Sequence, residues 1–213
     1  MGTSTFFATP FYRADKREIG LACEIADLCL SLQEEGYEKQ LPPQGKIANV
    51  FESRFDFLER PDPAVLTLKK QIFSTLAGFV AVVNDLSPEV AAGLPWSYHS
   101  WFHVTTKGGY FRAHTHPLAS WSVVFCARRG DDLHNSPGNQ GDLVFYDPRT
   151  NASMFLDPAN RNMRRELYFN SFKINVQDGD LLIFPSYLTH FVEPYLGEAQ
   201  RITVAANFWV SGS

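Results

Sequence analysis

The second half of the chain alternates short runs of aromatic and β-branched residues with turn residues, and this pattern constrains the fold most strongly. Turn signals such as Gly108-Gly109, Asp147-Pro148 and Asp178-Gly179 separate the runs. About eight short strands at such spacing are typical of a jelly roll or a barrel. The runs comprise residues 98–106, 110–116, 121–127, 142–147, 167–176, 180–185, 189–194 and 201–210.

The N-terminal part has the pattern of helices instead. Asp15 to Glu18 resembles a capping box before an apolar stripe that Gly36 would end. Asp62-Pro63 predicts the start of a second helix, with proline at its first position. Residues 40–57 are expected to form a loop with some extended structure. The two apolar stripes, which we expect to cover a sheet, are Ile19, Ala22, Ile25, Cys29 and Leu32, then Val65, Leu68, Ile72, Leu76, Phe79 and Val83.

These patterns together predict one domain that is mainly β with N-terminal helices (α+β). Residues 1–95 would form a helical and loop flank, and residues 96–213 a double-stranded β-helix, which is the cupin-like form of the jelly roll. A chain of 213 residues is suited to one domain with a full core. The segment 150–165 is long for a connection in a compact domain, and such loops are usually functional or mobile.

Composition excludes several classes of partner. The formal net charge is −4 and no block of lysine and arginine occurs, which argues against nucleic acid or an anionic membrane as the main partner. The start of the chain lacks the pattern of a signal peptide, and we expect no membrane span. The 3 cysteines form no CxxC pair, so we expect a reduced, cytoplasmic protein without a cysteine metal site.

The motif His114-Thr-His116-Pro117 places two imidazoles two residues apart. On a strand, such residues project from one face, as two ligands of one metal ion require. Alone the motif is weak, because two histidines on an outer face give the same pattern. His190 follows an apolar strand and a turn, and in a jelly roll it would supply a third ligand; otherwise it is a half-buried histidine at a strand end. The remaining histidines are expected to be structural or at the surface: His99, His103 and His134.

Arg201 opens the last strand-like run, on which Thr203, Ala205 and Asn207 share its face. A buried arginine is costly unless an anion meets it, and its planar fork suits a carboxylate. Ala205 leaves space on the same face. The alternatives are a salt bridge to an acidic loop residue such as Glu198, or a surface arginine that keeps its charged end in water.

Together these residues resemble the iron(II)/2-oxoglutarate-dependent oxygenase superfamily, and within it a bacterial and phage group with an H-x-H-P motif. The resemblance covers nearly the whole chain. It rests on Phe7-Ala-Thr9-Pro10, His114 to Pro117, Ser122 to Phe125, Asp147-Pro148-Arg149, Gly179-Asp180, His190 to Pro194 and Arg201 to Phe208.

The resemblance implies an enzyme that uses Fe(II), 2-oxoglutarate and O2 to oxidise a small-molecule or peptide substrate. It makes His114, His116 and His190 the metal ligands. Arg201 would bind the far carboxylate of 2-oxoglutarate, with help from Thr203. Tyr110 would add a hydrogen bond, because it shares the strand face of His114. The substrate and the oligomeric state stay open, a homodimer included.

One departure from the superfamily concerns His116, which stands where a carboxylate ligand is usual. Two histidines and one carboxylate form the facial triad of non-haem Fe(II) oxygenases. Three neutral imidazoles leave the ion with its full charge, and they also suit Zn(II) as the alternative ion. Asp147 is a candidate for supplying the carboxylate from elsewhere. The other reading makes one of the two motif histidines a residue that only orients a ligand.

Two alternatives belong to other functional classes. A cupin-like metalloenzyme shares the fold and fits the spacing of Gly108 to His116, but it requires no Arg201 and expects a glutamate where Ser120 stands. A non-catalytic β-sandwich binding module would keep the histidine strand for structure alone, and its three histidines would then diverge in space. Trp101, Trp121, Phe125 and Tyr146 are expected to build the core, and Arg149 is a candidate for substrate contact or a solvent-exposed turn residue.

Overall fold

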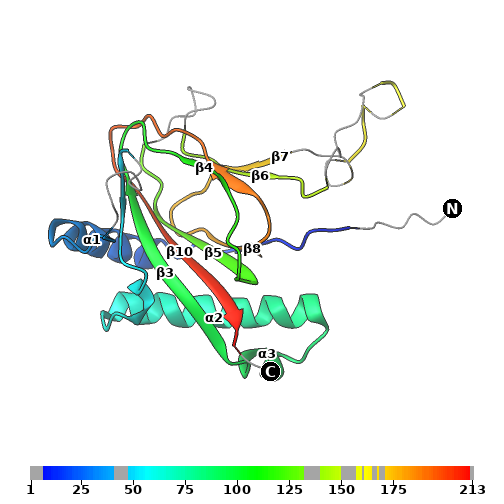
Figure 1. Cartoon of the computed structure of the whole chain (residues 1–213), viewed down its shortest axis with the longest axis horizontal. Helices are drawn as coiled ribbons and strands as arrows, with labels where there is room; N and C mark the ends of the chain where they lie inside the picture. Colours follow the sequence, from blue (N-terminus) through cyan, green and yellow to red (C-terminus); the bar gives the residue numbers. More distant parts are fainter. Residues whose placement is uncertain are drawn as a thin grey trace.

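The computed structural model describes residues 7–40, 48–131, 140–149, 157–159, 161–164, 167 and 171–211. In these residues two antiparallel sheets face each other (Figure 1). The larger sheet has the strand order β1-β8-β5-β10-β3-β2, and the smaller has the order β4-β9-β6-β7. The strands are β1 (Tyr12–Arg13), β2 (Val50–Glu52), β3 (Trp96–Thr105), β4 (Phe111–His114), β5 (Trp121–Arg128), β6 (Leu143–Tyr146), β7 (Ser171–Ile174), β8 (Leu181–Pro185), β9 (His190–Val192) and β10 (Arg201–Val210).

Each of the eight predicted runs overlaps one strand, from β3 to β10, although β3 begins two residues before its run and β5 ends one residue after its run. These strands form a four-plus-four jelly roll that β1 and β2 extend. The predicted fold class is therefore confirmed. β10 lies at the centre of the larger sheet, where it pairs along its whole length with β3 and over most of its length with β5. β3 therefore has register partners for Arg201, Thr203 and Asn207, and β5 has them for Thr203 and Asn207.

The helices are α1 (Ile19–Glu34), α2 (Pro63–Asn84) and α3 (Pro88–Ala92), with a short 3-10 helix at Phe57–Glu59. α2 begins as predicted, with Asp62 before Pro63 at the first position. The predicted capping box of α1 is wrong, because the residue at the N-cap is Glu18 and no side chain caps the helix. α1 ends close to Gly36, whose φ of 76° is one that glycine adopts without strain.

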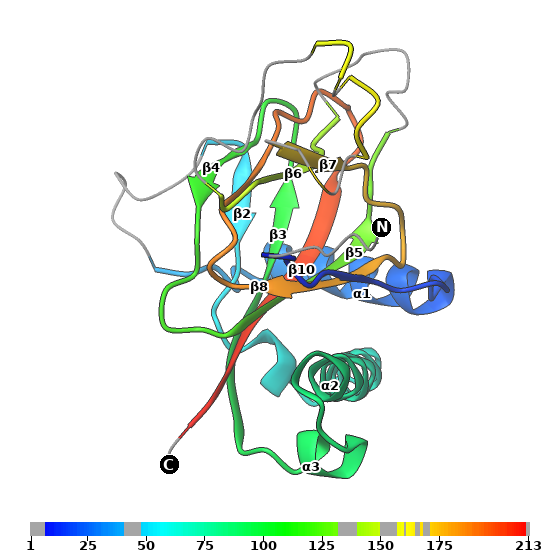
Figure 2. The same ribbon diagram turned by 90° about the vertical axis from the view of Figure 1, so that its right-hand side faces the viewer.

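Helices α1 and α2 lie on one face of the larger sheet, and the smaller sheet lies over the other face (Figure 2). One hydrophobic core joins the buried faces of both helices to alternate residues of β3, β5, β8 and β10. A second, smaller core lies between the two sheets and includes Leu143, Phe145 and Phe184. The larger sheet is therefore buried on both faces, but by different partners.

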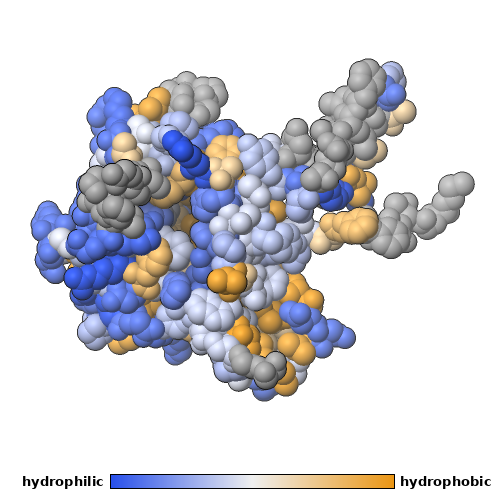
Figure 3. Space-filling view, in the orientation of Figure 1, coloured by the Kyte–Doolittle hydropathy of each residue, from blue (hydrophilic) through white to orange (hydrophobic). Residues whose placement is uncertain are grey.

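The stripe of α2 is buried at Val65, Leu68, Ile72 and Leu76, but Val83 is exposed because the buried face shifts to Val80 and Ala81 near the end of the helix. By length and hydropathy alone, α2 is long and apolar enough to cross a membrane, as the core helix of a protein can also be. Its buried stripe belongs to the core against the sheet. Figure 3 shows apolar residues at the lower right, where Figure 1 places the end of α2 and α3.

Candidate metal centre and cosubstrate pocket

His114 and His190 are partners in the smaller sheet. His114 ends β4, His190 begins β9, and the two residues lie opposite each other in register. Directly opposed residues on neighbouring strands have their side chains about 5 Å apart at Cβ, and the two ring centroids are 4.4 Å apart. The apolar run before His190 therefore returns the chain beside the H-x-H motif, as predicted.

His116 lies beyond the end of β4, so the second histidine is held by a loop and not by the strand. Its backbone N–H donates to the carbonyl of Ser186, 3.0 Å away, and this bond ties the loop to the turn after β8. The His116 ring centroid is 5.0 Å from that of His114 and 5.1 Å from that of His190. The three rings therefore surround one point.

Backbone carbonyls fix the tautomers of two of these rings. Nδ1–H of His114 donates to the carbonyl of Arg112 at 2.7 Å, and Nδ1–H of His190 donates to that of Leu188 at 2.9 Å. A neutral imidazole that donates through Nδ1 carries its lone pair on Nε2. Second partners of this kind orient metal-binding histidines in proteins. The Nε2 atoms of His114 and His190 therefore each carry a lone pair that can bind a metal ion.

One nitrogen from each ring forms a group whose members all lie within 4.8 Å of one another. Metal–nitrogen bonds of about 2.0–2.1 Å place two ligands of one ion at most about 4 Å apart, so a small rotation of the rings closes the site. Among the described residues this group contains no carboxylate. Asp147, the candidate for a carboxylate ligand, instead binds the guanidinium of Arg149 through both of its oxygens.

Burial keeps two of the histidines neutral. Burial and the neighbouring imidazoles lower the pKa of His116 to about 3. For His190, burial lowers the pKa to about 4 against an opposing effect of the Leu188 carbonyl. Both rings therefore offer a lone pair at neutral pH, which a divalent transition metal requires. The donor set fits Fe(II), and it fits Zn(II) as well.

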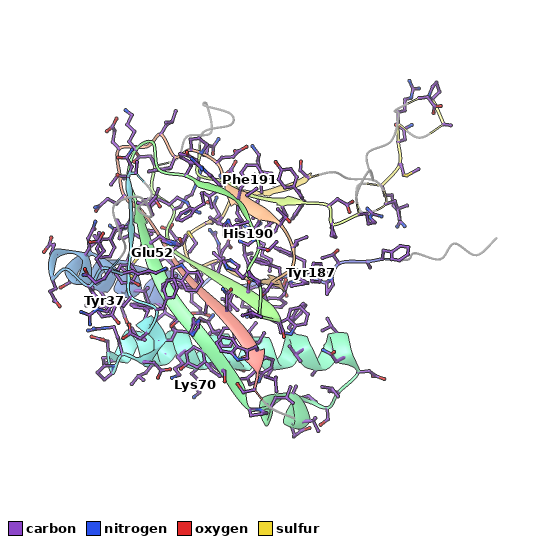
Figure 4. All side chains as sticks on the ribbon, viewed as in Figure 1. Tyr37, Glu52, Lys70, Tyr187, His190 and Phe191 are labelled. Carbon is purple, nitrogen blue, oxygen red and sulfur yellow. The ribbon has the colours of Figure 1, made fainter. Side chains whose placement is uncertain are left out.

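A cavity between the two sheets begins at the three histidines and contains about 560 Å³, its open mouth included. Figure 4 shows His190 near the middle of the molecule, between the ribbons of the two sheets. Besides the histidines, the lining residues are Trp101, His103, Phe111, Ser122, Val123, Val124, Leu143, Phe184, Val192, Arg201, Thr203, Ala205 and Asn207.

Arg201 lines this cavity and is only 3% exposed, so the surface alternative for this arginine is wrong. Its Nε is buried without a hydrogen-bond partner, and no ion pair joins it to another described residue. Gly141, at φ 69°, lies against the arginine stem, and a Cβ there would come within 2.9 Å of the Arg201 Cδ. Burial lowers the pKa of Arg201. A buried arginine that lines a cavity and is paired with no described carboxylate side chain is suited to binding a carboxylate ligand.

Thr203 lies on the same face of β10 as Arg201 and lines the cavity. Tyr110 does not: it precedes β4, is 38% exposed and is absent from the cavity lining. The reason is a register shift in β4 between Phe111 and His114. Phe111 lines the cavity together with His114, three residues later, so strict alternation misplaces the tyrosine.

His103, which was expected to be structural or at the surface, lines the cavity. Its Nε2–H donates to Glu52 of β2 at 3.0 Å, and Lys39 binds the same carboxylate. Figure 4 shows Glu52 on the side of the molecule where β2 joins the sheet. Burial alone would raise the pKa of Glu52, but hydrogen bonds and charges from His103 and Lys39 lower it. The i, i+2 spacing from Trp101 to His103 on β3 is the signal that could have found this wall of the cavity.

The other predicted residues divide between core, pocket and surface. Phe125 is buried in the core, Trp121 is partly buried against it, and Trp101 lines the cavity. Tyr146 is 44% exposed and is not a core residue. Arg149 is partly exposed and paired with Asp147. His99 is exposed, whereas His134 and most of the segment 150–165 lie outside the described residues.

Comparisons with known proteins agree with this geometry. Residues 99–207 match the model of a family described as "Putative 2OG-Fe(II) oxygenase". No curated protein matches the chain. Among solved structures, a Pseudomonas putida prolyl-4-hydroxylase is 15% identical with a TM-score of 0.62, covering 96% of this chain and 94% of its own.

Two further structures show the same fold. A prolyl hydroxylase from Trichoplax adhaerens, in complex with a hypoxia inducible factor oxygen degradation domain peptide fragment, is 13% identical with a TM-score of 0.58, and the match covers 94% and 83% of the two chains. HygX from Streptomyces hygroscopicus, with nickel, 2-oxoglutarate and hygromycin B bound, is 13% identical with a TM-score of 0.56, and the match covers 96% and 84%.

The three histidines converge, so the reading as a module with diverging histidines is wrong. The match with the oxygenase family favours the oxygenase interpretation over the cupin-like metalloenzyme. The family model spans residues 99–207, which carry all three histidines and Arg201. The chain therefore belongs to the family of 2-oxoglutarate- and Fe(II)-dependent oxygenases.

Proposed function

We propose that His114, His116 and His190 hold Fe(II), and that Arg201 and Thr203 hold the far carboxylate of 2-oxoglutarate. The observation that carries this assignment is the buried guanidinium without an anionic partner, in the same cavity as three converging imidazoles. A metal chelate at one end and a carboxylate clamp at the other match the two ends of a keto diacid.

With Fe(II) bound, 2-oxoglutarate and O2 supply the oxidising chemistry, in which 2-oxoglutarate becomes succinate and CO2 while the substrate is oxidised. The residues of this chain orient the reactants. The Arg201 guanidinium and the Thr203 hydroxyl would hold the tail carboxylate through hydrogen bonds that they donate. Val124 and Phe184 are apolar residues of the cavity lining and would exclude water from the bound cosubstrate.

The substrate of this site is proposed to be a small molecule or a peptide. Support comes from neighbours of the same fold, one of which holds a peptide fragment and another hygromycin B. We propose no nucleic-acid partner, in keeping with the net charge of −4.

The test uses protein loaded with Fe(II) under anaerobic conditions. Addition of 2-oxoglutarate should be detected by isothermal titration calorimetry as one site per chain, and addition of O2 should then produce succinate even without substrate, at a slow rate. His190→Ala should lose metal, and Arg201→Ala should lose 2-oxoglutarate while keeping metal. Retention of 2-oxoglutarate binding by Arg201→Ala would contradict the cosubstrate assignment, and absence of bound transition metal in the wild type would contradict the function.

A further inference from the structure

A chain of buried hydroxyl groups orients one side chain of the cavity, Asn207. The Ser122 hydroxyl donates to Oδ1 of Asn207 at 2.8 Å, and the same hydroxyl lies 2.8 Å from that of Ser186. Because Ser122 has one proton and gives it to Asn207, the Ser186 hydroxyl donates to Ser122. Both serines are at most 2% exposed. The Asn207 oxygen is therefore occupied, and its NH2 group remains to donate into the cavity that the residue lines.

The place of Asn207 along β10 puts it on the substrate side of the metal. Arg201, Thr203, Ala205 and Asn207 succeed one another on the cavity face, because alternate residues of a strand share a face. The proposed cosubstrate clamp occupies the first two positions. Ala205 pairs with Trp101, which contacts the His116 ring at 5.9 Å between centroids, so Ala205 is level with the metal site. Asn207 is one step farther from the clamp.

Trp101 supplies a second donor near this position. The residue lines the cavity and is 6% exposed, and its indole Nε1 is buried without a hydrogen-bond partner. An unsatisfied buried N–H costs about 1–3 kcal/mol, and such a group in a cavity wall marks a position where a ligand supplies the acceptor. Trp101 is the diagonal neighbour of Asn207 on the sheet, and such pairs are about 7–8 Å apart.

The sheet beyond Asn207 carries an aromatic platform made of Phe55, His99 and Trp209. His99 pairs in register with Asn207, and its ring lies 5.0 Å from that of Trp209 and 6.3 Å from that of Phe55. Phe55 in turn contacts Trp101 at 4.8 Å. Phe55 and His99 are exposed. The platform continues the cavity wall out to solvent, so a substrate longer than the cavity would lie across it.

The charge of the surroundings distinguishes a neutral acceptor from an anionic one. Arg201 is the one cation among the described residues that line the cavity, and the proposed cosubstrate uses it. Lys39, which lies over the Phe55 ring, is bound to Glu52. Neutral N–H donors do not offset the cost of burying a carboxylate. They do suit a carbonyl oxygen, which accepts two hydrogen bonds.

We propose that Asn207 and Trp101 form a substrate subsite that binds the carbonyl oxygen of an amide, with Ser122 as a positioning residue for Asn207. This inference rests on the proposed function and narrows it to substrates with an amide carbonyl near the carbon that is oxidised. The amide belongs either to a peptide that crosses the aromatic platform or to an acylated small molecule.

The test uses protein loaded with Co(II), a paramagnetic and redox-silent ion, and saturated with N-oxalylglycine, the amide analogue of 2-oxoglutarate. N-methylacetamide is the first probe, and the blocked tripeptide acetyl-Ala-Ala-Ala-amide is the second. Relaxation of the acetyl methyl protons by Co(II) reports binding beside the metal. Both probes should show it in the wild type. Tighter binding of the tripeptide indicates a peptide substrate, and equal binding indicates an acylated small molecule.

Asn207→Asp is the discriminating variant, because it keeps the shape and the bond from Ser122 but presents an oxygen to the cavity. It should weaken both probes at least about tenfold, since an acceptor then faces an acceptor. Trp101→Phe should weaken them about two- to tenfold. Asn84→Asp, the same change at an exposed residue of α2, should leave them unchanged. Metal and N-oxalylglycine affinities are measured for every variant, and the probes are compared at saturation with both, so that a change at the metal is not counted as a change at the subsite.

Ser122→Ala tests the positioning role through non-additivity. Alone it should weaken the probes about two- to fivefold, because the freed amide can rotate, but in the Asn207→Asp background it should add nothing. Absence of methyl relaxation in the wild type, or equal probe binding by Asn207→Asp, overturns the subsite. Failure of N-oxalylglycine to bind Co(II)-loaded protein instead overturns the cosubstrate assignment, and the subsite with it.

Discussion

The two faces of the larger sheet bury their residues in opposite ways. On the face toward the helices, Phe102 and Val104 of β3 are at most 1% exposed and belong to the main core. Polar groups on that side have partners: the Ser100 hydroxyl accepts from the backbone of Leu58, and that of Ser53 accepts from the backbone of Phe102. The residues on this face therefore contribute to the free energy of unfolding.

The face toward the smaller sheet contains buried polar atoms without partners, namely Trp101 Nε1, Thr105 Oγ1 and Arg201 Nε. These residues alternate with the core residues of the same strands. Each buried polar atom without a partner costs about 1–3 kcal/mol. The face toward the smaller sheet therefore lowers the free energy of unfolding, whereas the face toward the helices raises it. Substitutions on the two faces of one strand should therefore change the free energy of unfolding in opposite directions.

Phe102→Ala should have the largest effect on stability. Removing a fully buried ring from the helical face should lower the free energy of unfolding by about 3–5 kcal/mol. Urea unfolding followed by circular dichroism measures the change. At temperatures where the variant remains folded, it should bind metal like the wild type, because the cavity face is untouched. A selective loss of metal binding would show that the two faces of the sheet are not independent.

Arg201→Met should change stability and binding in opposite directions. Replacing an unpaired buried charge with an apolar side chain should raise the free energy of unfolding of the ligand-free protein by about 1 kcal/mol or more. The same change should weaken 2-oxoglutarate binding about 100-fold, since the carboxylate loses its charged partner. Calorimetry and urea unfolding check the two effects, with Arg149→Met as the control. A less stable Arg201→Met protein would show that the arginine has a structural role.

His190→Ala should lower Fe(II) or Zn(II) affinity by more than about 100-fold, because loss of a ligand exceeds the 10- to 100-fold effect of losing a supporting residue. Competition with a chromophoric chelator measures it. His99→Ala is the matched control and should keep the affinity, since His99 is exposed and outside the cluster. Equal losses in both variants would indicate an indirect effect on folding.

The metal-free protein should lose stability as the pH falls below about 6.5. Burial lowers the folded-state pKa of His116 to about 3 and of His190 to about 4, both from an ordinary value of 6.5. The unfolded chain therefore takes up protons first, and the loss continues until the folded state is protonated near pH 4 to 3. Urea midpoints from pH 7 to 5 check this. In His116→Asn the slope against pH should be shallower, and an unchanged slope would show that other groups cause it.

Thr203→Val should have the smallest effect. The change preserves shape and removes one hydroxyl from the cavity face, so 2-oxoglutarate affinity should fall by about 0.5–1.5 kcal/mol, or roughly two- to tenfold. Stability of the ligand-free protein should stay within about 0.5 kcal/mol. Calorimetry with the metal-loaded protein resolves the difference. No change in affinity would place the tail carboxylate on Arg201 alone.

The elements of the fold were largely predictable because their signals are local. Alternation and turn residues located all eight strands of the jelly roll, and Asp62-Pro63 located the start of α2. The capping box at Asp15 failed because the helix begins later, at Ile19. The exposure of Val83 and of Tyr146 also differed from expectation, since local periodicity cannot show where a packing partner ends.

The residue types of the site were predictable from the sequence: an H-x-H motif, a later histidine, and an arginine at the start of the last strand. The register of His114 with His190, and the carbonyl that accepts from Nδ1 of each, depend on the tertiary structure. The tertiary structure also brought Phe111 to the cavity instead of Tyr110, and joined His103 to Glu52 from 51 residues away. Alternation follows from the backbone of one strand, whereas register, bulges and hydrogen bonds between strands depend on how distant segments pair. The chemistry of the site was therefore readable from the chain, and its geometry was set by the pairing of the sheets.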